Sequence, residues 1–146
     1  MSVTGRCHCG AIRIEIDHPV ELLVNCHCRN CRRANGGAFS TITPVIGDAF
    51  RIIAGTDFLK AFETSTGHRY FCEICGGRLF SRPADAPEYA NVLVSTLDEE
   101  PATAPSVHLN CESKAPWYKI RDEAPQFASI PEMPAPPETN PNQEEG

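Results

Sequence analysis

The chain has 146 residues, of which 41% are hydrophobic, and this size and composition suit one domain with a buried core. The formal net charge is −6, and the glutamates of residues 128–146, which have no Lys or Arg beside them, account for −4 of it. A near-neutral or acidic body binds polyanions poorly because such binding needs clustered Lys and Arg, so we expect no nucleic-acid partner. No apolar run approaches the ~20 residues that span a bilayer, so we expect no membrane partner.

Apolar and polar side chains alternate over residues 11–17, where Ile12, Ile14 and Ile16 share one face, and this predicts the first strand. Further short apolar runs, separated by Gly, Pro, Asp or Thr, predict strands at 21–26, 39–45, 50–54, 59–64, 69–71, 78–82, 91–95 and 107–110. One short helix is predicted at 28–35, ended by Gly36 and Gly37. The pattern is typical of a mainly β fold.

From residue 128 the chain becomes rich in Pro, Glu, Asn and Gln. Such a segment buries too little apolar surface to offset the entropy of ordering, so we expect a disordered tail or an extended docked strand. The predicted organisation is one domain over residues 1–127, followed by a Pro- and Glu-rich tail over residues 128–146.

Seven of the eight cysteines form three tight clusters: Cys7 and Cys9, then Cys26, Cys28 and Cys31, then Cys72 and Cys75. Eight cysteines could instead form disulfides. However, such close neighbours do not suit disulfide geometry, the N-terminal residues contain no apolar signal-peptide core, and the chain is larger than the small secreted domains that depend on disulfides. We therefore expect reduced, metal-binding thiols and a cytoplasmic location.

The seven clustered cysteines divide into a group of four and a group of three. Residues i and i+2 of a strand point to one side, so we expect Cys7 and Cys9 to reach one ion. Cys72 and Cys75 would complete that site from a turn in which Gly76 and Gly77 permit positive φ. Four thiolates close a structural zinc site, whereas Cys26, Cys28 and Cys31 leave one coordination position open, which is where zinc performs chemistry. The sequence thus predicts two zinc ions per chain.

Three arginines, Arg29, Arg32 and Arg33, are expected around the group of three. They would either hold the carboxylates of an anionic ligand or form a solvated helix face. The eighth cysteine, Cys111, would be either a fourth ligand of the second zinc or a small buried side chain.

No catalytic residue is assigned by the sequence. His27 and His108 are the only histidines considered for proton transfer, and packing or hydrogen bonding is the simpler role for each. Trp117 is expected in the core or in a pocket wall.

With these residues described, the chain resembles the family of glutathione-dependent formaldehyde-activating enzymes, which is grouped with the centromere protein V family. The resemblance covers about residues 3–127 and rests on G-R-C-H-C-G at residues 5–10, C-H-C-R-N-C-R-R at 26–33, F-C-E-I-C-G-G at 71–77, V-S-T-L-D at 94–98, H-L at 108–109 and K-A-P-W at 114–117. It implies a β-tent fold, in which small antiparallel sheets meet around zinc. It also implies a structural ion on Cys7, Cys9, Cys72 and Cys75, and an active-site ion on Cys26, Cys28 and Cys31.

Two functions remain open from the sequence. The resemblance implies a zinc-dependent carbon–sulfur lyase that acts on a small thiol adduct, such as the adduct of glutathione with formaldehyde. The alternative is a non-catalytic zinc module that binds a thiol, a metal or a protein partner. An open coordination position inside a pocket would favour the lyase, and a closed second site would favour the module. Nothing in the sequence indicates the oligomeric state.

Overall fold

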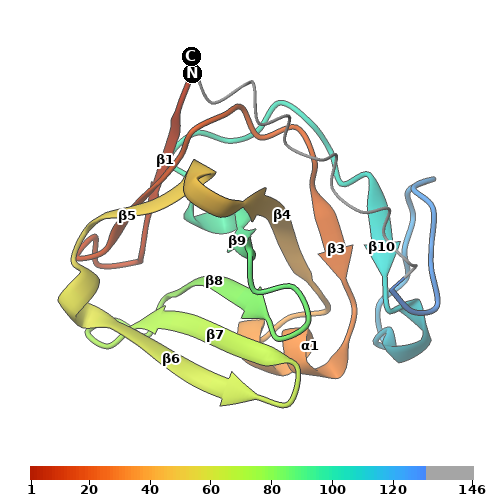
Figure 1. Cartoon of the computed structure of the whole chain (residues 1–146). Coiled ribbons are helices and arrows are strands. Elements are labelled where there is room, and N and C mark those ends of the chain that lie inside the picture. Colours follow the sequence, from red (N-terminus) through yellow and green to blue (C-terminus); the bar gives the residue numbers. More distant parts are fainter. Residues whose placement is uncertain (131–146) are drawn as a thin grey trace.

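Two β-sheets make up most of the structure, a computed structural model that describes residues 1–130 (Figure 1). The smaller sheet has the antiparallel order β1-β2-β5, with β1 at Val3–Arg6, β2 at Arg13–Ile16 and β5 at Phe50–Ala54. The larger sheet has seven strands in the order β10-β3-β4-β9-β8-β7-β6. Its strands, in chain order, are β3 (Val24–Cys26), β4 (Ser40–Ile46), β6 (Leu59–Thr64), β7 (Gly67–Cys72), β8 (Arg78–Pro83), β9 (Tyr89–Leu93) and β10 (Val107–Leu109).

The core is built from apolar side chains of both sheets. The alternation along β2 buries Ile14 and Ile16 completely, while Arg13 faces solvent. Phe80 of the larger sheet stacks on Tyr70 with ring centroids 4.5 Å apart, and its other neighbour is Phe50 of the smaller sheet, at 4.7 Å. Because aromatic side chains bury large apolar areas, this group joins the two sheets through one continuous hydrophobic cluster.

Most strand predictions are confirmed. The strands predicted at 50–54 and 59–64 match β5 and β6 at both ends, and the others agree within a few residues. The strand predicted at 91–95 begins earlier, at Tyr89, and its end is replaced by a 3₁₀ turn at Val94–Thr96. The strand predicted at 11–17 is β2. The strand before it, β1, was not predicted, because its short sequence V-T-G-R has no alternating pattern.

The position of the first cysteine pair differs from the prediction. Cys7 and Cys9 lie in a tight turn after β1 rather than in a strand, and the amide of Gly10 donates to the carbonyl of Cys7 at 3.1 Å. Gly10 has a φ of +82°, which glycine adopts without steric cost. The two side chains are therefore brought together by a turn and not by strand alternation.

The resemblance implied antiparallel sheets, but the larger sheet contains one parallel pair of strands. β10 runs parallel to β3, with His108 opposite Asn25. Parallel neighbours need a long connection, and here residues 27–106 lie between the two strands. The chain after β10 folds back beside it: the amide of Phe127 donates to the carbonyl of His108 at 2.9 Å, and the amide of His108 donates to the carbonyl of Pro125 at 2.9 Å.

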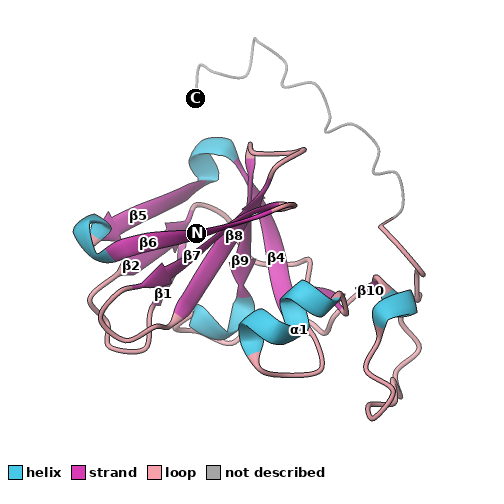
Figure 2. Cartoon of the chain, turned by 90° about the horizontal axis from the view of Figure 1, so that it is seen from below, coloured by secondary structure: helices cyan, strands magenta, loops and turns pink. Residues whose placement is uncertain are grey.

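The only α-helix of residues 1–130 is α1, at Arg29–Asn35, as predicted. The Cys28 side chain caps its N-terminus, and Gly36, in the left-handed conformation, ends it. Figure 2 shows α1 beside the end of β4, with β10 and the following chain at one side of the molecule.

Short 3₁₀ turns lie at Gly47–Ala49, Thr56–Phe58 and Cys111–Ser113. Within residues 1–130, no helix has the length and apolar character needed to cross a membrane. Most of the predicted tail, residues 131–146, lies outside the described residues.

Candidate functional site

The structure brings four cysteines together between the turn after β1 and the connection from β7 to β8. The Sγ atoms of Cys7, Cys9, Cys72 and Cys75 all lie within 4.8 Å of one another. The Cys7–Cys9 and Cys9–Cys72 sulfur distances are 3.7 and 3.9 Å. A tetrahedral zinc ion with four Zn–S bonds of ~2.3 Å has sulfurs about 3.8 Å apart. The four thiols could therefore hold a metal ion of the size and geometry of zinc.

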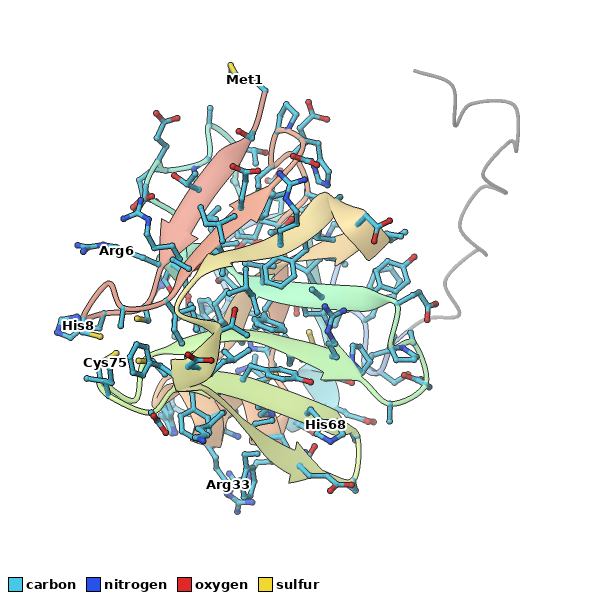
Figure 3. The ribbon with its side chains drawn as sticks, turned by 60° about the vertical axis from the view of Figure 1, so that its left-hand side comes forward. Met1, Arg6, His8, Arg33, His68 and Cys75 are labelled. Carbon is cyan, nitrogen blue, oxygen red and sulfur yellow. The ribbon has the colours of Figure 1, made fainter. Side chains whose placement is uncertain are left out.

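Two glycines shape this group. Gly76 has a φ of +72°, as predicted, and Gly77 donates its amide to the Cys75 sulfur at 3.4 Å. A Cβ atom on Gly77 would lie 3.0 Å from the amide nitrogen of His8, so the missing side chain lets the two turns approach. Figure 3 shows His8 and Cys75 next to each other at one edge of the molecule. Backbone amides that donate to sulfur, as Ile12 also does to Cys7 at 3.3 Å, hold thiolates in place.

The other three cysteines meet at the start of α1. Cys26 ends β3, Cys28 caps the helix, and Cys31 lies in its first turn, with all three sulfurs within 4.8 Å of one another. The amide of Cys31 donates to the Cys28 sulfur at 3.2 Å. Two side chains from distant segments also reach this group: Asn110 donates to Cys26 at 3.2 Å, and Arg69 donates to Cys31 at 3.7 Å. We call this group the three-cysteine centre.

The pKa shifts of the three thiols are consistent with a site that binds a metal cation. Hydrogen bonds with Cys26 and Cys31 lower the pKa of Cys28 to about 2, whereas hydrogen bonds with Cys26 and Cys28 raise the pKa of Cys31. The thiols thus share protons, and one thiolate suppresses ionisation of the next. All three become thiolates together only when a positive ion offsets their charge, as a coordinated metal does.

A cavity of about 540 Å³ opens directly on the three-cysteine centre. Its wall includes Cys26, Cys28 and Cys31, and it has the volume of a small-molecule site. A larger cavity of about 870 Å³ shares Arg78 with it but contains only one cysteine, Cys7, from the group that already supplies four thiols. The three-cysteine centre therefore combines an incomplete ligand set with space for a ligand, and we take this cavity as the candidate active site.

Comparison with known proteins decides the family. The model of the family described as glutathione-dependent formaldehyde-activating enzyme matches residues 2–113. The chain belongs to this family. It is 32% identical over 143 residues to a protein of Halomonas elongata that is provisionally named a glutathione-dependent formaldehyde-activating enzyme, and the match covers 90% of each chain.

Two further similarities have a narrower meaning. A protein of Penicillium rubens with the same provisional name is 34% identical over 80 residues, which cover 53% of this chain and 42% of that protein. A crystal structure of a Rhodobacter sphaeroides protein superimposes with a TM-score of 0.55 at 23% identity, covering 85% of this chain and 99% of that one. At this identity the similarity concerns the fold alone.

In this member of the formaldehyde-activating enzyme family, the helical arginines do not line the cavity at the three-cysteine centre, so the alternative in which they form a separate helix face is favoured. Arg29, Arg32 and Arg33 line a separate shallow pocket of about 230 Å³, together with Trp117. Arg32 lies over the Trp117 ring at 5.8 Å and donates to the carbonyl of Ser113 at 3.0 Å, while Arg33 projects from the surface (Figure 3). The cysteines use the inner side of the short helix, so its arginines occupy the outer side. Trp117 is 69% exposed, so it lines this pocket but is not in the core.

Cys111 lies outside both cysteine groups. Its amide donates to the carbonyl of Phe127 at 2.9 Å, and burial raises the pKa of its thiol. The alternative in which Cys111 completes the second site is therefore wrong. The fourth position of the three-cysteine centre receives no thiol from residues 1–130.

The buried His27 and His108 form a hydrogen-bonded chain that ends at the exposed Asp122. The ring nitrogens Nε2 of His27 and Nδ1 of His108 are 2.8 Å apart, and Nε2 of His108 lies 2.9 Å from Asp122. Burial, followed by the proximity of His108, lowers the pKa of His27, which favours the neutral ring. The two histidines connect β3 to β10, the two neighbouring parallel strands.

Four polar residues near the centre had no assigned role in the sequence: Arg69, Arg78, Asn110 and Asp122. Only Asn110 has a residue type that hints at its local conformation: its φ is +57°, and Asn tolerates this left-handed conformation better than most residues. Arg69 and Arg78 approach the site from strands β7 and β8, and Asp122 approaches it from the chain after β10, through His108. None of these three arrangements leaves a mark in the local sequence.

Proposed function

We propose that the chain is a zinc-dependent carbon–sulfur lyase that forms or cleaves the bond between a small thiol and formaldehyde, as in the glutathione–formaldehyde adduct. The observation that carries this proposal is the three-cysteine centre, whose incomplete ligand set faces a cavity. Membership of the family and the names of the relatives support the choice of thiol and aldehyde.

We assign two zinc ions, one structural on Cys7, Cys9, Cys72 and Cys75, and one at the active site on Cys26, Cys28 and Cys31. When bound at the second position, zinc supplies Lewis acidity and stabilises a thiol as its thiolate. In the same proposal, the two sheets form the β-tent of the family, and residues 1–127 act as one unit. Reduced thiols suit a reducing compartment such as the cytoplasm.

The residues around the centre have defined tasks in this reaction. The thiol sulfur bonds to the carbonyl carbon, and the thiol proton ends on the carbonyl oxygen; cleavage reverses both changes. Asn110 and Arg69 donate to cysteine sulfurs and so fix the orientation of the ligand thiolates. The apolar side chains of Ile42 and Leu93 line the same cavity.

The test compares wild type with Cys28→Ser. Formation and decay of the glutathione–formaldehyde adduct, and of adducts with other thiols, are followed against the uncatalysed rate, because thiols add to formaldehyde unaided. We expect wild type to exceed this rate and Cys28→Ser to lose all excess turnover while staying folded, since the four-cysteine group is untouched. Cys111→Ser is the matched control, because Cys111 lies outside both groups, and it should keep wild-type turnover.

Two results would contradict the proposal. Wild type that never exceeds the uncatalysed rate with any adduct would leave a non-catalytic zinc module as the better description. Equal turnover by wild type and Cys28→Ser would move the chemistry away from the three-cysteine centre.

A further inference from the structure

Two arginines face the three-cysteine centre without an acidic partner. Arg69 lies on β7, and Arg78 is the first residue of β8. Arg69 donates to the Cys31 sulfur at 3.7 Å, and Arg78 donates to the side-chain oxygen of Asn35 at 3.3 Å. Neither forms an ion pair with any acidic residue among residues 1–130, where the Lys and Arg ion pairs are Arg13–Asp98, Arg51 with Glu15 and Asp17, and Lys60–Glu73.

Arg78 is held in an unfavourable environment. Its Nε is buried and has no hydrogen-bond partner among the described residues. Burial, and then the nearby charge of Arg69, lower the pKa of Arg78. A cation that is removed from water beside a second cation costs free energy unless an anion pairs with it. A guanidinium has five N–H donors, and Arg78 uses one of them on Asn35.

The two arginines differ in how their charges are offset. Three thiolates around a divalent ion carry a net charge of −1. Arg69, which contacts Cys31, offsets this charge. The two guanidinium groups together carry one more positive charge than the centre carries negative charge, so one charge remains available for a ligand, and a planar guanidinium matches a carboxylate in a bidentate pair.

The remaining wall of the cavity is mostly uncharged. Besides Arg69 and Arg78, its charged side chains are Arg82 and Asp85. Arg82 is already engaged, because it donates to the carbonyls of Pro87 and Tyr89 and lies over the Phe80 ring at 5.6 Å. Arg69 and Ser81 are opposite each other in the β7–β8 pairing and both line the cavity, so this face of the sheet supplies further donors to the same ligand.

We propose that Arg69 and Arg78 form a carboxylate subsite, so that the thiol bound at the three-cysteine centre must carry a carboxylate a short chain away from its sulfur. The chain is short because Arg69 touches a cysteine of the centre itself. This inference rests on the proposed function only in taking the centre as the place where the thiol binds. It selects mercaptocarboxylates over neutral and cationic thiols.

The test measures binding without formaldehyde, by isothermal titration of the metal-loaded full chain. The probes are 3-mercaptopropionate and 3-mercapto-1-propanol, which have equal carbon chains and differ in the carboxylate. Wild type should bind the acid about tenfold or more tightly than the alcohol, because charge-assisted bidentate pairs are strong. Arg78→Gln should lose most of this preference while its affinity for the alcohol stays unchanged, and Arg78→Lys should keep part of it.

Arg33→Gln is the matched control, since it removes an equal charge from the outer side of α1, and it should keep the full preference. Equal affinity of wild type for the two probes would overturn the proposal. So would a preference that survives in folded, metal-loaded Arg78→Gln and Arg69→Gln. A clear preference without turnover would support the subsite while contradicting the lyase. Turnover without preference would overturn the subsite alone.

Discussion

Three side chains join the loop of the three-cysteine centre to the segment after β10. A carboxylate only accepts hydrogen bonds, so Nε2 of His108 donates to Asp122, and Nδ1 of His108 is left to accept from Nε2 of His27. The tautomers of both rings follow from the one acid at the end of the chain. Because His27 lies between Cys26 and Cys28, Asp122 fixes the backbone of the metal-binding loop from a distance.

Asp122→Asn tests this chain through the pH dependence of stability. The hydrogen bond from His108, and then one from the amide of Ala124, lower the pKa of Asp122. A depressed carboxyl pKa contributes stability above its ordinary value of about 3.9, and this contribution is lost as the pH falls through the folded-state pKa. Wild type should therefore unfold at higher urea than Asp122→Asn at pH 7.

The difference between the two chains should begin to shrink at about pH 4, where Asp122 of the unfolded chain becomes protonated, and should vanish only below the lower pKa of Asp122 in the folded chain. Loss of metal in acid affects both chains, so only their difference is informative. A difference that stays constant from pH 7 to pH 3 would mean that the Asp122 charge does not stabilise the fold.

Two connections, one after β1 and one between β7 and β8, meet through four cysteines, although more than sixty residues separate them in the chain. Each connection is a short turn that has few apolar side chains of its own to bury. Cys7 and Cys72 also belong to the hydrophobic core, but the exposed Ile74 and the sulfur-bonded amides of Ile12 and Gly77 indicate that contacts to sulfur help to organise this end of the molecule.

Cys72→Ser should therefore give an unfolded or insoluble chain. Structural zinc binding is worth about 10–16 kcal/mol in small peptides, which is comparable to the ~5–15 kcal/mol total stability of a domain. Soluble yield and circular dichroism are the measurements, with Cys111→Ser as the control that should fold normally. A Cys72→Ser chain that melts like wild type would show that the four-cysteine group is not structural.

Sequence spacing predicts local features of this site well and long-range features poorly. The three-cysteine centre, the helix ended by Gly36, and β5 and β6 depend on residues close together in the chain, and they appear where expected. The four-cysteine group joins two distant pairs, and it could be predicted because each pair already has the spacing of metal ligands. Arg69 reaches Cys31 only because the helix start and β7 are neighbours in space, and the sequence pattern does not indicate this contact. The parallel pairing of β3 with β10 likewise depends on a connection of many residues whose path the sequence pattern does not encode.

Taken together, the two cysteine groups predict two metal ions per chain with different exchange behaviour. Native mass spectrometry should show two zinc ions. On addition of a chelator, the ion of the three-cysteine centre should leave first, because it has fewer thiol ligands and faces a cavity. Circular dichroism should change only when the second ion leaves. A chain that holds one ion when fully loaded, or unfolds with the first loss, would contradict this division.

The uneven spread of the two ligand sets has a consequence for synthesis on the ribosome. Cys26, Cys28 and Cys31 emerge almost together, whereas the set of Cys7 and Cys9 is completed only after Cys75. Until then the nascent chain presents five clustered thiols, one more than a tetrahedral ion can bind, so wrong combinations of the first two clusters compete with the correct one. Metal that binds before Cys72 and Cys75 have emerged can thus trap the chain in a misassembled state.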